Sequence, residues 1–213
     1  MKVIKPYRLM SKDEIERHAE DLLVRVQAKR KRPIKGYSIA EAIADFLDIG
    51  VVWDSIPPDN EGQIAAMILP LQKEIVINKD IPELQGGFGQ STIAHEIGHW
   101  ILHIDKNAVG QFIERLNLGM ETNLEPFLCR SVNTHTGIEW QAQYFASCLL
   151  MPLFKLEEVR RGRDLTKWSH LYAIKDELGV TISNLTNRLQ GLGWINIVKG
   201  SKQIYPGKVA QKG

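Results

Sequence analysis

Two histidines spaced four residues apart constrain the fold of this chain more than any other feature of its sequence. They stand in the segment His95-Glu-Ile-Gly-His99. Because an α-helix repeats every 3.6 residues, both imidazole rings point to the same side of a helix, where they can bind one metal ion together. The carboxylate of Glu96 can then act as a base on a water beside that ion. The spacing therefore predicts a helix with metal ligands on one face.

The residues around the two histidines favour one continuous helix from Ser91 to His103. Ile93, Ile97 and Ile101 recur at i, i+4 and i+8 and form an apolar stripe. The polar residues on the opposite side are Thr92, His95, Glu96, His99 and His103. This pattern predicts that one face packs while the other carries chemistry. A surface helix that merely contains two histidines is the alternative, and it predicts no third ligand nearby.

A third ligand is expected because a catalytic zinc ion takes three protein ligands and leaves one position open. The segment 136–152 reads as a second helix, which the proline at its end terminates. Glu139, Ala142 and Ala146 lie on one face of it, at i, i+3 and i+7. Small side chains on that face would let the two helices approach closely, so that Glu139 reaches the metal.

Other roles and other ligands remain open from the residues alone. Thr136 and Glu139 match a capping box, in which the glutamate only satisfies a backbone N–H at the start of the helix. We favour the ligand role because of the paired histidines. Gln141 is a poor alternative, since a neutral amide is a weak zinc ligand. The carboxylates that follow the histidine motif without a clear periodicity are Glu114, Glu121 and Glu125.

The histidine motif and the second helix together resemble the ImmA/IrrE family of metallo-endopeptidases. The first motif is His95-Glu-Ile-Gly-His-Trp-Ile-Leu-His103. The second and more specific motif is Glu139-Trp-Gln-Ala-Gln-Tyr-Phe-Ala-Ser-Cys-Leu-Leu-Met-Pro152. The resemblance covers about residues 10 to 155. It departs from the family pattern at Gln143, where the family often has asparagine.

The resemblance implies a zincin-like metallopeptidase domain that binds Zn²⁺ through His95, His99 and Glu139, with Glu96 as the catalytic base. It also implies a protein substrate, namely a helix-turn-helix transcriptional repressor. His103 matches a histidine that is frequent in the family. It lies one turn past His99 and about 80° around the helix from His95, which suits a neighbour of the site better than a fourth ligand.

The composition is typical of a soluble globular chain. Its 213 residues, 44% hydrophobic and 24% charged, fit one medium domain or one domain with a small appendage. A formal charge of +2 is too small to indicate a nucleic-acid partner by itself. Cys129 and Cys148 form neither a disulfide scaffold nor a Cys-x-x-Cys site, and Cys148 is expected to be buried. Neither a signal peptide nor a long apolar segment is present, so we expect a cytoplasmic protein with no membrane contact.

The chain before the histidine motif is predicted to contain two helices and a small antiparallel sheet. Capping boxes begin the helices at Ser11 and Ser38, and Gly50 fits the end of the second helix. The segments expected as strands are 51–53, 64–69 and 74–78, the last two joined as a hairpin. An edge strand of this sheet can either hold an extended substrate or only cover the histidine helix.

Two stretches beside the motif are expected to lack regular structure. Residues 82–90, with three glycines, form a flexible lead into the histidine helix. Residues 104–135 form a lid or an irregular loop over the site. His135, at the end of that stretch, either helps to stabilise an oxyanion or is an exposed loop residue.

The chain changes character after Pro152. From Lys155 onward, eleven Lys and Arg against five Asp and Glu give a net charge of +6. A helix that ends at Gly179, a second helix capped by Thr181 and a hairpin across Gly200 make a winged-helix-like arrangement. The second helix can bind DNA in such an arrangement, but it holds one arginine, so we favour protein docking or a structural role. The polar residues on it are Asn184, Asn187, Arg188 and Gln190.

We therefore expect an α+β chain, with a mainly helical zincin-like domain at 1–155 and a winged-helix-like region at 156–213. The main hypothesis is a zinc-dependent endopeptidase. One alternative is a non-catalytic regulator that acts on DNA or on a protein through its C-terminal region. The other is a structural zinc site, which usually fills the fourth position with Cys or His. We favour the enzyme because both histidines and both glutamates that the chemistry needs are present.

Overall fold

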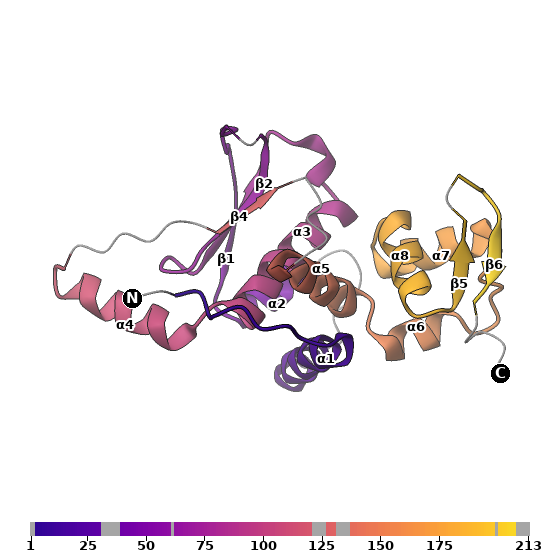
Figure 1. Cartoon of the computed structure of the whole chain (residues 1–213), viewed down its shortest axis with the longest axis horizontal. Coiled ribbons are helices and arrows are strands. Elements are labelled where there is room, and N and C mark those ends of the chain that lie inside the picture. The colour runs from indigo at the N-terminus through magenta and orange to yellow at the C-terminus, as the bar shows by residue number, and fades with distance from the viewer. Residues whose placement is uncertain are drawn as a thin grey trace.

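The computed structural model describes residues 3–30, 39–60, 62–120, 127–130, 137–198 and 200–207. Within them the chain is α+β and mainly helical with a small sheet, as predicted (Figure 1). The helices are α1 (Lys12–Lys29), α2 (Ile39–Phe46), α3 (Gly87–Gly98), α4 (Lys106–Asn117), α5 (Gly137–Leu150), α6 (Leu153–Val159), α7 (Trp168–Leu178) and α8 (Ile182–Gly191). The strands are β1 (Gly50–Asp54), β2 (Ile64–Leu69), β3 (Glu74–Asn78), β4 (Phe127–Arg130), β5 (Ile195–Ile197) and β6 (Ile204–Pro206). No helix in the described part of the chain has the length and apolarity needed to cross a membrane.

The main sheet has the strand order β1-β3-β2-β4. The predicted hairpin is confirmed, because β2 and β3 pair antiparallel with Ile68 opposite Ile75. The expectation of an antiparallel sheet is confirmed for the pairs of β2 with β3 and β4 but is wrong for β1. β1 pairs parallel with β3, with Val52 opposite Val76, since the chain passes from β1 across to β2 and leaves β3 between them. β3 is therefore a central strand, and its residues Ile75 and Ile77 are fully buried.

The predicted ends of two helices need correction. Gly50 does not stop α2; the helix ends at Phe46, Asp48 takes the left-handed φ of 59°, and Gly50 opens β1. The histidine helix begins at Gly87, inside the stretch expected to be a flexible lead. Gly89 is needed for close packing and does not indicate flexibility, because a Cβ there would lie 2.0 Å from the carbonyl oxygen of Leu84. A glycine in this segment therefore serves close packing within a helix.

The expectation that residues 104–135 lack regular structure is wrong in part. It contains α4, whose N-cap Asp105 accepts hydrogen bonds from the backbone N–H of Asn107 and Ala108. It also contains β4, which pairs antiparallel with β2. His135 lies outside the described residues.

The C-terminal elements follow the predicted order. α7 ends at Gly179, whose φ of 70° is the left-handed conformation typical of a helix C-terminus. The hydroxyl of Thr181 then accepts from the backbone N–H of Asn184 and caps α8. β5 and β6 form the expected hairpin. α6 was not predicted; it begins directly after Pro152, which takes the extended conformation of an N-cap.

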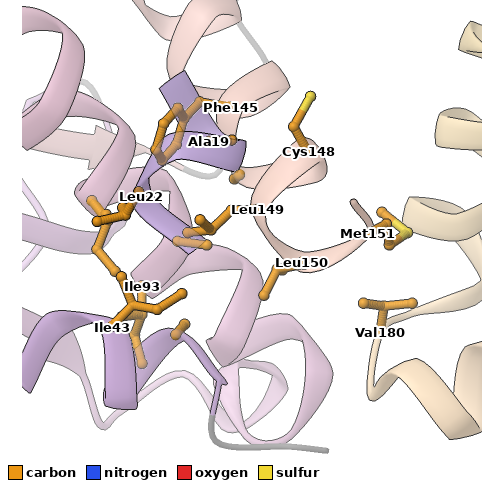
Figure 2. Close-up of a cluster of buried hydrophobic side chains, with 14 of the residues drawn as sticks. Ala19, Leu22, Ile43, Ile93, Phe145, Cys148, Leu149, Leu150, Met151 and Val180 are labelled. Atoms are coloured by element: carbon orange, nitrogen blue, oxygen red, sulfur yellow. The ribbon is translucent and has the colours of Figure 1, made fainter. Parts of the chain in front are cut away.

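One buried apolar cluster joins the N-terminal helices to the C-terminal elements. Leu22 of α1, Ile43 of α2, Ile93 of α3 and Phe145 of α5 meet in it, and all four are fully buried (Figure 2). The cluster continues from the end of α5 to Val180, just before α8. Its residues come from both sides of position 155, so α8 is held against the helices that carry the histidine motif.

Candidate metal centre

The two helices of the site cross at a glycine. A Cβ on Gly98 would lie 3.0 Å from both the Cα and the carbonyl oxygen of Ala142, so no larger residue fits without moving α5. Ala142 and Ala146 are fully buried on the facing side. The prediction that small residues allow a close approach of these helices is confirmed. The consequence is that a glutamate on α5 comes within reach of histidines on α3.

Three ligand atoms from these helices converge. Nε2 of His95 lies 3.0 Å from Nε2 of His99 and 3.2 Å from a carboxylate oxygen of Glu139. The other carboxylate oxygen of Glu139 lies 3.4 Å from Nε2 of His99. A tetrahedral ion with bonds of about 2.0–2.1 Å places its ligand atoms about 3.3 Å apart. The separations are close to that value, and the three residues, each with a ligand atom within 4.8 Å of the others, could hold a metal ion.

The direction of the Glu139 side chain distinguishes the two roles left open by the sequence. Its carboxylate faces the histidines on α3, as a ligand must. Thr136, the other half of the suggested capping box, lies outside the described residues. Of the rival carboxylates, Glu114 lies on α4 and is absent from the ligand group, while Glu121 and Glu125 also lie outside the described residues.

The surroundings keep His99 and Glu139 in their metal-binding charge states at neutral pH. His99 is fully buried, and this burial lowers the pKa of its imidazole from 6.5 to about 4, so a lone pair is available. Burial opposes the ionisation of Glu139, but the adjacent imidazoles of His95 and His99 outweigh it and hold the pKa of its carboxyl well below the usual value. Glu139 is therefore a carboxylate at pH 7.

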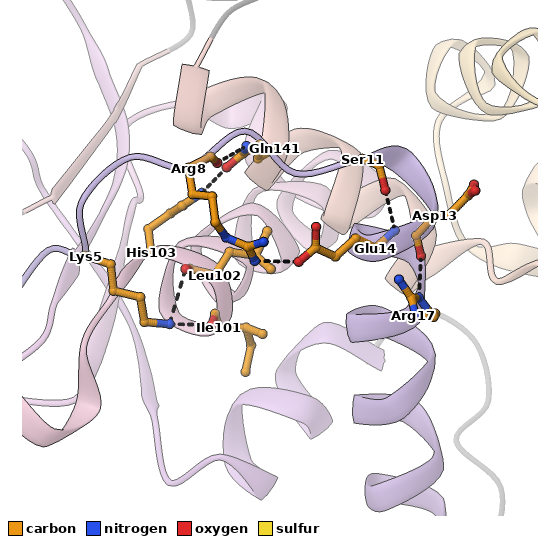
Figure 3. A network of polar contacts seen from close by, with 10 residues as sticks. All are labelled: Lys5, Arg8, Ser11, Asp13, Glu14, Arg17, Ile101, Leu102, His103 and Gln141. Carbon is orange, nitrogen blue, oxygen red and sulfur yellow. Dashed lines mark hydrogen bonds and ion pairs between the residues drawn. The ribbon is translucent and has the colours of Figure 1, made fainter.

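A chain of hydrogen bonds fixes which nitrogen of His99 carries its proton, and Figure 3 shows the part of it from Arg8 through Gln141 to His103. The amide nitrogen of Gln141 donates to the carbonyl oxygen of Arg8 at 2.8 Å, which orients the amide. Its oxygen then lies 2.9 Å from Nε2 of His103, so we assign the His103 proton to Nε2. Burial lowers the pKa of His103 and keeps its ring neutral, so Nδ1 of His103 must be an acceptor.

The donor to that acceptor is a ligand residue. Nδ1 of His103 lies 3.1 Å from Nδ1 of His99, which therefore carries a proton and donates it. Nε2 of His99 is left with its lone pair directed at the ligand group. Metal-binding histidines generally donate their second N–H in this way, and such partners fix the ring tautomer. His103 is thus a neighbour of the site outside the ligand group, as predicted.

An N-terminal segment holds this chain of hydrogen bonds in place. The backbone N–H of Lys5 donates to the carbonyl of His103 at 2.8 Å, and that of Asp105 donates to the carbonyl of Val3 at 2.7 Å. The ammonium of Lys5 also donates to the carbonyls of Ile101 and Leu102 (Figure 3). These two carbonyls belong to the π-helical turn His99–His103 that continues α3, where backbone oxygens lack helical partners.

The remaining predicted site residues are placed as follows. Glu96, the expected base, is fully buried on α3 between the two histidines. Cys148 is a buried free thiol, and burial raises its pKa to about 12, which fits the predicted apolar role. The backbone of Cys129 pairs with Ala66 in the sheet, and no role is assigned to it.

The polar residues of α8 are largely engaged within the chain. Arg188 is 3% exposed and forms an ion pair with Glu16 of α1, and its Nε donates to the carbonyl of Met151. Asn184 donates to the hydroxyl of Ser91 on α3 at 2.9 Å. The side chain of Gln190 accepts from the backbone of the β5 strand. The residues suggested as a DNA-binding face thus fasten α8 to α1, α3 and α5, with Asn187 left exposed.

A scan against protein-family models and a search of curated proteins both return no match for this chain. The resemblance stated above therefore remains a prediction from its two motifs. Sequence reasoning missed Arg8 and Gln141 as parts of the site. The only sequence signal for this hydrogen-bond chain was Gln141, a polar residue on the packing face of α5. Gln141 is fully buried, and a buried polar side chain needs hydrogen-bond partners.

Proposed function

We propose that this chain is a zinc-dependent endopeptidase. The observation that carries the proposal is the convergence of His95, His99 and Glu139 at 3.0–3.4 Å, with a glutamate between the two histidines on the same helix. Two imidazoles and one carboxylate are a usual ligand set for a catalytic zinc ion, which leaves the fourth position open for water or substrate. A structural zinc ion would need a fourth protein ligand, and the described residues place no other Cys or His in the group.

When bound, zinc would supply Lewis acidity, which polarises the scissile carbonyl and makes a water acidic enough to attack at neutral pH. Glu96 accepts a proton from the attacking water, whose oxygen forms a bond to the carbonyl carbon. Glu96 then delivers that proton to the amide nitrogen as the C–N bond breaks. His103 and Gln141 keep His99 in the required tautomer throughout. The products are one new carboxylate and one new amine.

The finer parts of the proposal rest on the family resemblance. It favours a zincin-like architecture for the helices that carry the motif, a cytoplasmic location and a helix-turn-helix repressor as substrate. The order α7, α8 and hairpin fits the winged-helix-like region proposed at 156–213. The alternative of a regulator that acts through α8 on DNA gains no support from the contacts of Arg188 and Asn184, since both side chains are used inside the chain.

The test compares the wild type with Glu96→Gln in cells that contain each protein. New protein N-termini are identified by mass spectrometry. Termini should appear with the wild type and fall about 10²- to 10⁴-fold with the variant, because a positioned base contributes that much to proton transfer. Purified wild type and variant must both retain metal. Equal termini in both samples would show that the assigned base is wrong.

A further inference from the structure

A pocket of about 210 Å³ continues the two helix faces that carry the candidate ligands. Ser91 lines it and lies one turn before His95 on the same side of α3. Gln143 and Ser147 also line it, one and two turns after Glu139 on the same side of α5. One helical turn is about 5–6 Å, so the pocket lies within the reach of a side chain next to the cleaved bond.

The other walls come from the two ends of the described chain. α1 contributes Lys12, and α8 contributes Asn187 and Arg188. The bond from Asn184 to Ser91 and the ion pair of Arg188 with Glu16 hold α8 in this position. The C-terminal region thus completes a pocket whose lining begins one helical turn from the candidate ligands His95 and Glu139.

The lining favours an anionic group at the end of an aliphatic stem. Lys12 and Arg188 are cationic, and among the described lining residues none is a carboxylate. The charge of Arg188 is balanced by Glu16, so Lys12 supplies the uncompensated positive charge. The side chains of Gln143 and Asn187 are exposed, and their amide N–H groups can donate to an incoming carboxylate. The apolar lining that would contact methylene groups consists of Trp140, Leu150 and Met151.

We propose that this pocket selects an acidic substrate residue, of glutamate length, beside the cleaved bond. The proposal rests on the proposed endopeptidase function, because only then does a peptide lie across the centre. A basic side chain meets Lys12 and is rejected by like charge. A purely apolar side chain fills the stem region but forms neither an ion pair with Lys12 nor hydrogen bonds with the amides of Gln143 and Asn187. Lys12 and Asn187 are therefore specificity-determining residues.

The test uses N-acetylated amino-acid hydroxamates, whose hydroxamate group binds the metal while the side chain samples the pocket. Three probes of similar length are compared on the zinc-loaded full chain: glutamate, norleucine and lysine hydroxamate. The glutamate probe should bind about two- to fivefold more tightly than norleucine, the size of a partly exposed charge interaction, and the lysine probe most weakly. Equal affinities, or a preference for norleucine or lysine, would overturn the pocket assignment while leaving the metal site intact. If none of the probes binds, the open metal site itself is refuted, and the proposed function fails with it.

Two variants assign the selectivity to named residues. Lys12→Gln should remove the preference for glutamate over norleucine, and Asn187→Asp should reverse the order of the glutamate and lysine probes. Lys167→Gln is the matched control, because Lys167 is exposed and does not line the pocket. The norleucine probe should bind all three variants as it binds the wild type. Unchanged selectivity in both pocket variants would also overturn the proposal.

Discussion

Replacing His103 by leucine should weaken zinc binding by about 10- to 100-fold while the metal-free protein still folds. In the wild type, Nδ1–H of His99 donates to Nδ1 of His103 at 3.1 Å. Leucine offers no acceptor at that place. When Nε2 of His99 holds a metal ion, the ring proton must stay on Nδ1, where it becomes a buried donor without a partner. Such a donor costs about 1–3 kcal/mol, or about 5- to 150-fold in affinity.

This cost falls on the metal-bound state alone. Without metal, the proton of His99 can move to Nε2, which lies 3.4 Å from a carboxylate oxygen of Glu139. The loss of the His103 bond to Gln141 affects both states equally and cancels in the affinity. The measurement is the zinc dissociation constant, obtained by competition with a chromophoric chelator, alongside urea unfolding of the metal-free protein.

The matched control is His103→Asn. The amide oxygen of asparagine takes about the position of Nδ1 in histidine and can accept the same hydrogen bond, so this variant should bind zinc within a few-fold of the wild type. The reasoning is refuted if His103→Leu binds zinc as tightly as the wild type. Equal losses in both variants would also refute it, since they would indicate altered packing and not a missing acceptor.

Two further predictions concern the helix crossing and pH. Gly98→Ala should destabilise the protein by about 1–3 kcal/mol in urea unfolding, because its Cβ meets Ala142. Gly110→Ala should not lower the free energy of unfolding, because Gly110 lies on α4 with open space around it. A similar loss of unfolding free energy in both variants would contradict the close crossing of α3 and α5 at Gly98. Because the pKa of His99 is lowered from 6.5 to about 4, the unfolded chain binds more protons in this range. Stability of the metal-free protein is therefore fully present above about pH 6.5 and falls by up to about 3 kcal/mol as the pH drops to 4. His99→Phe should reduce that loss, and an unchanged pH profile in the variant would exclude His99 as its source.

The parts of the fold that the sequence predicted well are those determined by neighbouring residues. Ser11 and Thr181 cap their helices through bonds that span three positions, and Gly179 ends α7 by its own left-handed conformation. The helical patterns that carry the candidate ligands belong to this class too, since His95 and His99 lie about one turn apart and Glu139 and Ala142 lie on one turn of α5. A periodic pattern is sufficient for such features because each needs only one element to form.

The parts that could not be predicted depend on residues distant in the sequence. The hydrogen bond between Gln141 and the Arg8 carbonyl spans 133 positions, and no local pattern marks either partner. The parallel pairing of β1 with β3 depends on the path of the chain from β1 to β2, which leaves β3 between them. The residues of the strand itself, Val51 to Trp53, do not determine that path. Gly89 was interpreted as a flexible position because the approach of Leu84 is visible only in three dimensions. α4 differs from these cases, because its N-cap residue Asp105 is a local signal that the sequence contains and that was not used.

The most direct test of the central claim is the metal content of the purified wild type and of Glu139→Ala, measured by elemental analysis without added zinc. The account predicts about one zinc ion per chain in the wild type and its loss in the variant, because two histidines alone hold the ion weakly. Zinc retained by Glu139→Ala would contradict the three-ligand site. Absence of metal from both proteins, even after zinc is supplied, would contradict the assignment of a metal centre altogether.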